Sequence, residues 1–159
     1  MTGQPAALVT GGSRGIGAAI VQRLLARGLP VVILDREAPA EASAARFVQC
    51  DLTDLAATQA ALARIAEENA ILWLVNNAGI AAPATLEETT IEDFDRVVAI
   101  NLRACILAAQ AALPAMKAAG KGRIVTISSR AALGKELRTA YSATKAGVIG
   151  LTRTWALEL

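Results

Sequence analysis

Short apolar runs alternate with longer amphipathic segments along this 159-residue chain. The apolar runs are rich in branched residues and nearly continuous in hydrophobicity, which is typical of strands buried on both faces of a sheet. We expect strands at Ala6–Thr10, Pro30–Leu34, Arg46–Cys50, Ile71–Val75 and Arg123–Ser128. Strands alternating with helices in this way predict one α/β domain over residues 1–159, with a doubly wound parallel sheet between two helix layers.

The segments between these strands carry apolar residues at helical spacing. After the first strand, Ile16, Ile20 and Leu24 form an apolar stripe, and Gly28 stands where a C-terminal cap is expected. Thr89 and Glu92 have the spacing of a capping box. We therefore expect three further helices: about Leu55–Glu68, from that capping box through Phe94, Val98 and Asn101 toward Met116, and from near Tyr141 to the end of the chain.

Histidine is absent, and its absence excludes Ser-His-Asp and Cys-His catalysis and an ordinary zinc site. Cys50 and Cys105 lie in apolar stretches without metal-ligand spacing, so we expect buried, reduced thiols and no metal site. The formal net charge is only +2 and no basic run stands out, which argues against nucleic acid as a partner.

The chain shows no targeting or membrane-spanning pattern. Its first residues, Met1 to Pro5, lack the charged and apolar regions of a signal peptide. Charged residues, Asn, Gly or Pro interrupt every apolar segment, so no membrane span is expected. These features together favour a cytoplasmic protein.

A glycine-rich turn, TGGSRGIG from Thr10 to Gly17, joins the first expected strand to the first helix. A dinucleotide pyrophosphate binds at such a turn, because backbone N–H groups at the helix N-terminus point at it and no Cβ blocks its approach. The spacing is Thr-Gly-x-x-x-Gly-x-Gly rather than the commoner G-x-G-x-x-G. A simple surface turn is the alternative. The candidate cofactor-binding residues here are Gly11, Ser13, Arg14, Gly15, Ile16 and Gly17.

Asp35 closes the second expected strand, twenty residues after Gly15. A carboxylate there can accept hydrogen bonds from an adenosine ribose diol and would repel a 2′-phosphate, which favours NAD. Arg14 points the other way, because a guanidinium in the phosphate turn could reach a 2′-phosphate and bind NADP. We give Asp35 more weight, since it should lie nearer the ribose. An ordinary solvated Asp at a strand end is the alternative.

Tyr141 and Lys145 are four residues apart, which places both on one face of a helix, one turn apart. A unit charge ~4 Å from the phenol contributes ~4 kcal/mol at an effective dielectric of ~20, so the ammonium would favour proton transfer by the phenol. This spacing is common in helices. The pair gains significance from the motifs that accompany it.

Taken together, these motifs resemble the short-chain dehydrogenase/reductase family, in its single-domain, 3-oxoacyl-reductase-like branch. The resemblance covers the whole chain and implies a Rossmann-type, three-layer α/β/α fold. It rests on six elements in the family's order: the turn at Thr10 to Gly17, Asp51 after the third strand, Asn76-Asn77-Ala78-Gly79 after the fourth, Asn101 within a helix, Ser129 after the fifth strand, and Tyr141-x-x-x-Lys145.

The resemblance implies an NAD(P)-dependent oxidoreductase that interconverts a secondary alcohol and a ketone. By resemblance, Tyr141 is the general acid and base, and Lys145 assists it and holds the nicotinamide ribose. Ser129 would polarise the reacting oxygen. Asn101 would bind a water that connects Lys145 to solvent. An ordinary helix-interior Asn is the alternative for Asn101.

The resemblance also assigns adenosine contacts. Asp51 would bind the exocyclic amine of adenine and the Leu52 N–H its ring, while Asn77, Ala78 and Gly79 would lie along the adenosine ribose. A turn or cap role is the alternative for Asp51, and a plain turn for the loop.

Two neighbouring serines compete for contact with the reacting oxygen. Counting from the strand favours Ser129, whereas counting back from Tyr141 favours Ser128, because eleven residues separate Ser129 from Tyr141 and many relatives have one more. We choose Ser129, since the strand end fixes the side chain while the loop absorbs a deletion.

Family members continue through two more strands, whereas this sequence stops at Leu159 within a helix. The Ile124 to Ile127 strand would then be an exposed apolar edge. We expect these residues to belong to a longer polypeptide or to pair with a second chain. The resemblance further implies a homo-oligomer, a dimer or tetramer, through the long helix after Thr90 and the one carrying Tyr141. The Ala-rich helix Ala104 to Ala119 could serve in this way, and packing within the chain is the alternative.

The substrate is a small alcohol or ketone whose identity would depend on the loop after Ser129, with Lys135 and Arg138, and on the stretch after Gly79. Those two basic residues hint at an anionic substrate, and a solvated loop is the alternative. Two other functions stay open: a nucleotide-sugar epimerase or dehydratase, and a truncated, non-catalytic nucleotide-binding or interaction subunit of the same fold.

Overall fold

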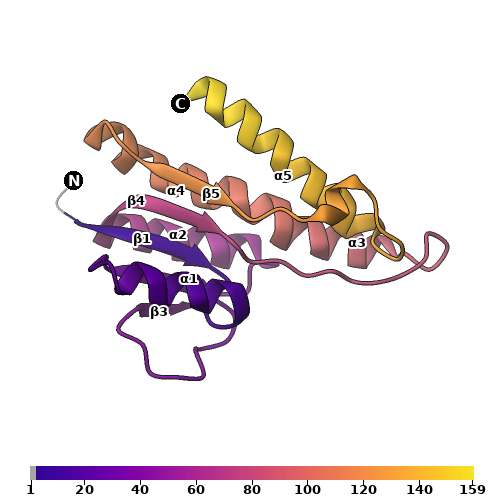
Figure 1. The fold of residues 1–159 in the computed structure, drawn as a ribbon, viewed down its shortest axis with the longest axis horizontal. Coiled ribbons are helices and arrows are strands. Elements are labelled where there is room, and N and C mark those ends of the chain that lie inside the picture. The colour runs from indigo at the N-terminus through magenta and orange to yellow at the C-terminus, as the bar shows by residue number, and fades with distance from the viewer. Residues whose placement is uncertain (1–2) are drawn as a thin grey trace.

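A five-stranded parallel sheet forms the centre of the computed structural model, which describes residues 3–159 (Figure 1). The strand order is β3-β2-β1-β4-β5, and every neighbouring pair runs parallel. Met1 and Thr2, part of the stretch expected to lack a signal peptide, lie outside the described residues. The strands are β1 (Gln4–Thr10), β2 (Val31–Asp35), β3 (Arg46–Gln49), β4 (Asn69–Asn76) and β5 (Arg123–Thr126).

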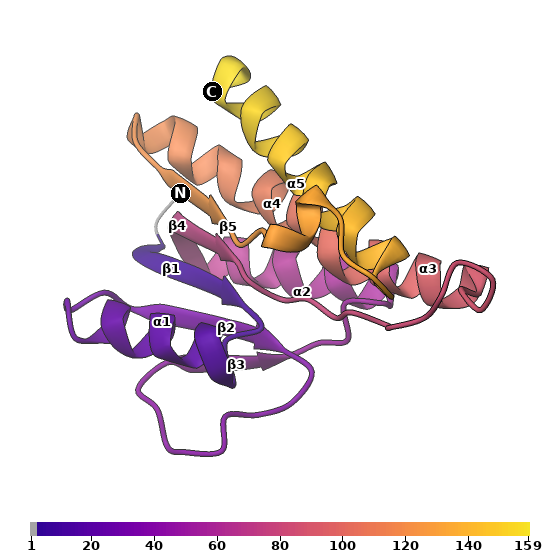
Figure 2. The same ribbon diagram turned by 45° about the vertical axis from the view of Figure 1, so that its right-hand side comes forward.

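Helices cover both faces of the sheet, which confirms the three-layer α/β/α prediction. Figures 1 and 2 show α1 on one face and α2 and α4 on the other. The helices are α1 (Gly15–Leu25), α2 (Leu55–Glu68), α3 (Ile91–Val98), α4 (Ala104–Ala119) and α5 (Thr139–Glu158), with a π-helix over Ala99–Arg103 and a 3₁₀ helix over Arg130–Leu133.

The core consists of two apolar clusters, one on each face of the sheet. Successive side chains of a strand point to opposite faces. In β1, Ala7 and Val9 therefore pack in the α1 cluster, while Ala6 and Leu8 pack in the cluster under α2 and α4. Trp155 of α5 packs against the second cluster.

Two of the predicted helix caps, at the C-terminus of α1 and the N-terminus of α3, can be compared with the structure. Gly28 has a φ of 75°, and the Leu29 N–H donates to the Leu24 carbonyl (3.2 Å), which confirms the predicted C-cap. The predicted capping box is wrong by one residue: Thr90 is the N-cap of α3, and its hydroxyl accepts from the Asp93 N–H (3.1 Å).

Thr89 and Glu92 do not cap the helix, because the Thr89 hydroxyl turns back to the Thr85 carbonyl (2.7 Å) in the preceding turn. A local hydrogen bond therefore competes with the predicted cap.

A π-helix over Ala99–Arg103 interrupts the helix that was expected to run through Asn101 toward Met116. Inserting one extra residue per turn re-aims the side chains that follow, and such bulges are frequent at functional sites. The whole segment Ile91–Ala119 is long and apolar enough to cross a membrane by length and composition. However, α4 packs on β4 and α2, as a helix of a folded core does.

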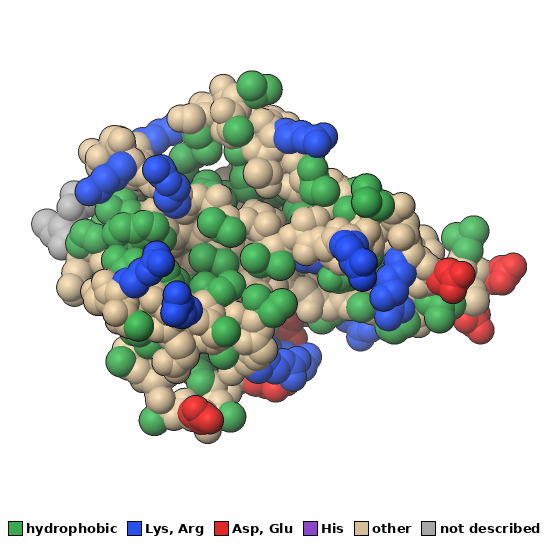
Figure 3. Space-filling view, in the orientation of Figure 1, with side chains coloured by type: hydrophobic (Ala, Val, Ile, Leu, Met, Phe, Trp, Pro, Cys, Tyr) green, Lys and Arg blue, Asp and Glu red, His purple; other side chains and the backbone are tan. Residues whose placement is uncertain are grey.

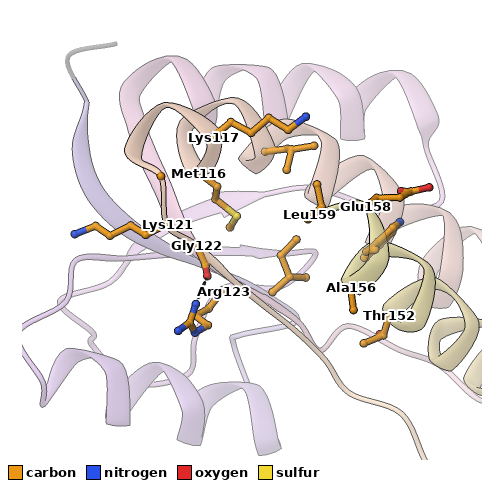
Figure 4. A pocket seen from close by; sticks show the side chains of 13 residues that line it. Met116, Lys117, Lys121, Gly122, Arg123, Thr152, Ala156, Glu158 and Leu159 are labelled. Atoms are coloured by element: carbon orange, nitrogen blue, oxygen red, sulfur yellow. Dashed lines mark hydrogen bonds between the residues drawn. The ribbon is translucent and has the colours of Figure 1, made fainter.

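β5 pairs with β4 alone and forms one edge of the sheet, and Val125 is 49% exposed, as expected for an apolar edge. Figure 3 shows hydrophobic side chains on this side of the molecule, interspersed with Lys and Arg. Beside β5, a groove of about 590 Å³ lies between the ends of α4 and α5 (Figure 4). Met116, Ile124 and Trp155 line it, with Lys117, Lys121 and Arg123 among the other lining residues.

Candidate active site

The turns after β1 and β4 are bound directly to each other. The strand order reverses between β1 and β4, and a crevice for a ligand forms at such a point. The Thr10 hydroxyl accepts from the N–H groups of Asn77 (3.1 Å) and Ala78 (3.2 Å), and the Asn77 amide donates to the Gly11 carbonyl (2.8 Å). The glycine turn and the Asn76–Gly79 loop therefore form one unit.

Glycine is needed at two positions of the turn for different physical reasons. A Cβ on Gly17 would lie 2.0 Å from the Gly11 carbonyl oxygen, so only glycine lets α1 approach the turn this closely. Gly15 has a φ of 56°, and a Cβ there would meet nothing within 4 Å. Gly17 is thus required by packing, whereas Gly15 is favoured by its left-handed backbone conformation.

The N-terminus of α1 offers unpaired donors. Arg14 is the N-cap residue, and its side chain makes no capping hydrogen bond to the first turn. Ser13 is 8% exposed, and its hydroxyl is buried without a partner. A buried hydroxyl beside free helix N–H groups fits a phosphate oxygen.

Asp35 lies at the end of β2, with its carboxylate bound to two backbone N–H groups. One oxygen accepts from Ser13 (3.0 Å), the other from Arg36 (2.7 Å). The Ser13 bond connects Asp35 to the glycine turn, which holds the carboxylate at the rim of that turn.

A cleft of about 300 Å³ opens between these turns and the end of β3. Most of the predicted coenzyme contacts line it: Gly11, Arg14, Ile16, Asp35, Asp51, Leu52, Asn77, Ala78 and Gly79. Arg36, Glu37 and Ile100 line it as well and were missed by the sequence reasoning. Ser13, Gly15 and Gly17 lie in the adjoining turn rather than on the cleft wall.

Asp51 accepts hydrogen bonds from the N–H (2.9 Å) and the hydroxyl (2.8 Å) of Thr53, and these bonds lower the pKa of its carboxyl below the ordinary value. The same turn is held from the π-helix: the Arg103 guanidinium donates to the carbonyls of Leu52 (3.3 Å) and Thr53 (2.7 Å). Nothing in the local sequence around Arg103 indicated this contact across fifty residues.

Asn101 is 1% exposed and bridges two elements. Its amide oxygen accepts from the Ile80 N–H (2.9 Å), and its amide nitrogen donates to the Ile80 carbonyl (2.9 Å) and the Thr144 hydroxyl (3.1 Å). Its own carbonyl accepts a weak bond from the Cys105 thiol (3.3 Å). Burial raises the pKa of that thiol to about 11, so it stays protonated near neutral pH.

Tyr141 and Lys145 lie side by side on the first turns of α5, with the Lys145 nitrogen 5.6 Å from the centroid of the Tyr141 ring. Lys145 is 4% exposed, and its ammonium donates to the Ile127 carbonyl (2.6 Å). Burial lowers the pKa of Lys145, opposed by the Cys105 thiol.

Gly79 connects this pair to the cleft. A Cβ built on Gly79 would lie 3.4 Å from the Asn101 amide oxygen and 3.5 Å from the Lys145 nitrogen. Since Gly79 also lines the cleft, the Lys145 ammonium lies immediately behind one of its walls.

The two candidate serines make different hydrogen bonds. The Ser128 hydroxyl donates to the Lys145 carbonyl (2.8 Å) and is therefore engaged with the backbone of α5. The Ser129 hydroxyl accepts from the Ala131 N–H (3.2 Å), capping the 3₁₀ helix, and keeps its own hydrogen free to donate. This difference favours the choice of Ser129.

The sequence model of the short chain dehydrogenase family matches residues 5–159. The chain belongs to this family. It is 41% identical over 162 residues to a 3-alpha-(or 20-beta)-hydroxysteroid dehydrogenase of Mycobacterium tuberculosis, and 40% identical over 154 residues to a 3-oxoacyl-(acyl-carrier-protein) reductase of the same species. Each match covers 96% of this chain and 62% of the relative.

Solved structures agree with this family assignment. A putative NAD(P) dependent gluconate 5-dehydrogenase from Beutenbergia cavernae, crystallised with NADP, matches with a TM-score of 0.91 and 34% identity over 99% of this chain and 67% of that one. The chain spans about three fifths of the length of the curated relatives it matches.

The two loops expected to contact the substrate meet in the structure. Ala84 and Arg138 form a parallel bridge, with the Ala84 N–H donating to the Leu137 carbonyl (3.3 Å). Lys135 is exposed, and the Arg138 guanidinium donates to the Leu137 carbonyl (2.9 Å). The stretch after Gly79 and the loop after Ser129 are therefore joined beside the start of α5.

Proposed function

We propose that the protein is an NAD(P)-dependent oxidoreductase that interconverts a secondary alcohol and a ketone, with Tyr141 as general acid and base. The buried Lys145 lies beside Tyr141 and next to Gly79, a residue of the cleft wall, and this arrangement carries the proposal. A phenol held in place beside a buried ammonium can act as a general acid and base toward a bound substrate.

The residues of the cleft fit a dinucleotide coenzyme, and NAD is the proposed form, with NADP as the alternative. The uncapped α1 N-terminus and the unpartnered Ser13 hydroxyl would hold the pyrophosphate. Asp35 would accept from the adenosine ribose diol, while Asp51 and the Leu52 N–H would face the adenine. Asn77 lines the cleft, and its side chain is fixed by its hydrogen bond to the Gly11 carbonyl in the glycine turn.

The bound nicotinamide would supply hydride transfer, and the protein supplies alignment and proton transfer. Tyr141 donates a proton to the substrate oxygen in reduction and takes one in oxidation. Ser129 donates a hydrogen bond to that oxygen and polarises it. Lys145 lies beside the Tyr141 ring and would exchange its bond to Ile127 for the nicotinamide ribose hydroxyls.

In this proposal, Asn101 mainly positions the Ile80 loop against α5. Both hydrogens of its side-chain amide are engaged by Ile80 and Thr144, so a water linking Lys145 to solvent would have to donate to an oxygen of Asn101, and we assign it to the main-chain carbonyl oxygen. That oxygen has a second lone pair beside the weak Cys105 contact.

The proposal extends to the oligomeric state and the cellular location of the protein. We propose a cytoplasmic homo-oligomer, a dimer or tetramer, whose interface includes α4 and α5. Small side chains along α4, such as Ala111, let another helix approach closely.

The test is a panel of ketones and secondary alcohols, each assayed with NADH or NADPH and with the oxidised coenzymes. At least one pair should turn over, and Ser129→Ala should reduce that turnover by about a hundredfold. The matched control Ser128→Ala should change turnover far less. NADH binding without turnover of any compound would contradict the proposal and favour a non-catalytic nucleotide-binding subunit.

A further inference from the structure

Glu37 lies between two arginines at the adenosine end of the cleft. One carboxylate oxygen accepts from the Arg36 guanidinium (2.9 Å), and the other lies 3.7 Å from the guanidinium of Arg14. Arg14, Arg36 and Glu37 all line the cleft, together with Asp35 and Asp51. The carboxylate therefore occupies the space toward which two cations converge.

The two arginines come from different turns. Arg14 precedes α1 in the glycine turn, and Arg36 follows the last residue of β2. Two guanidinium groups that converge from separate elements form an arrangement that binds a phosphate dianion, because each can donate two parallel hydrogen bonds. In this chain both face a carboxylate of the protein itself.

The charges at this end favour a neutral ribose over a phosphorylated one. The hydrogen bond from Arg36, and then the charge of Arg14, lower the pKa of Glu37, so its carboxylate is ionised throughout the neutral range. The lining residues of this end then carry three negative charges, on Asp35, Glu37 and Asp51, and two positive charges, on Arg14 and Arg36. The local charge is negative, and it would repel a 2′-phosphate.

We propose that Glu37 sets the coenzyme selectivity of this protein, by occupying both arginines and thereby excluding a 2′-phosphate. This inference rests on the proposed coenzyme site and makes it more specific. Arg14 and Arg36 form a latent site for a 2′-phosphate, and NAD is favoured because Glu37 holds them.

The ion pairs are exposed and individually weak: Glu37 is 57% exposed at its side chain, Arg36 65% and Arg14 81%. Removing the carboxylate should therefore leave the fold intact while freeing two cations for an anion. One substitution at Glu37 should therefore be enough to shift the coenzyme selectivity from NAD toward NADP.

The experiment measures the dissociation constants of adenosine 2′,5′-bisphosphate and of 5′-AMP by calorimetry at low ionic strength, so that it needs no turnover. Glu37→Gln should shift the affinity ratio about tenfold toward the bisphosphate. The matched control Glu41→Gln removes the same charge from an exposed loop position outside the cleft and should leave the ratio unchanged.

A second variant isolates the arginines. Adding Arg36→Ala to Glu37→Gln should cancel most of the gain for the bisphosphate while 5′-AMP affinity stays near that of the parent. An unchanged ratio in Glu37→Gln, or an equal shift in Glu41→Gln, would overturn the inference while 5′-AMP binding upheld the coenzyme site. Loss of 5′-AMP binding by the unmodified protein would instead overturn the proposed site, and the inference with it.

Discussion

The side-chain amide of Asn101 pairs with both backbone polar groups of Ile80, accepting from its N–H and donating to its carbonyl, each over 2.9 Å. The same amide reaches the Thr144 hydroxyl one residue before Lys145. The π-helix therefore connects the loop that lines the nucleotide cleft to the helix that carries the proposed catalytic pair.

Replacing Asn101 by Ala should lower the free energy of unfolding by about 2–3 kcal/mol, because it leaves two backbone groups of Ile80 without their partner. Urea denaturation measures the change. The control Asn69→Ala, which removes a single amide bond to the Ile65 carbonyl at the end of α2, should cost about 1 kcal/mol. Equal losses in the two variants would contradict the bridging role of Asn101.

Alanine substitutions at two glycines of the turn should separate stability from binding. Gly17→Ala places a Cβ 2.0 Å from the Gly11 carbonyl, so it should cost several kcal/mol or prevent folding. Gly15→Ala should cost only about 1 kcal/mol for its positive φ, because its Cβ would meet nothing within 4 Å, and in the proposed phosphate site it should weaken coenzyme binding.

Thermal unfolding and NADH titration check both variants side by side. A stable Gly17→Ala protein would contradict the packing role of Gly17, and full NADH affinity in Gly15→Ala would contradict phosphate binding at the turn.

Replacing Lys145 by Met should abolish turnover and raise stability by about 1 kcal/mol at pH 7. Burial lowers the pKa of Lys145 in the folded state below its ordinary value of 10.5, so below that folded value the buried charge carries its full cost. As pH rises from the folded pKa toward 10.5, the unfolded state binds more protons and this cost fades.

The stability gain of Lys145→Met should therefore be largest near neutral pH and diminish in alkali. Urea titrations at neutral and alkaline pH measure it, with the exposed Lys121→Met as control. A gain that grows with pH would mean that the buried ammonium is not the source of the cost.

Patterns within single elements predicted most of this fold. The continuous branched runs of β1, β2 and β4 indicated a buried parallel sheet, and α2 was predicted at its observed bounds. Glycines in the turn after β1 and the spacing of Tyr141 and Lys145 indicated the cleft and the pair beside it. These features depend on neighbours in sequence, so periodicity reveals them.

Contacts between distant segments could not be read in this way. Arg103 reaches the Leu52 and Thr53 carbonyls only because the π-helix turns it toward that loop. Glu37 faces Arg14 only because β2 ends beside the glycine turn. The N-cap of α3 was displaced to Thr90 by a competing bond of Thr89 to Thr85, which the sequence alone does not reveal.

The central claim is that Tyr141 transfers the proton while the rest of the cleft binds the coenzyme. The direct test is Tyr141→Phe, with kcat/KM for the best substrate and the NADH dissociation constant measured on the same preparation. We predict that kcat/KM falls by about a thousandfold or more while NADH affinity stays within about twofold of the parent. A Tyr141→Phe protein that retains more than a tenth of the parent activity would contradict the account.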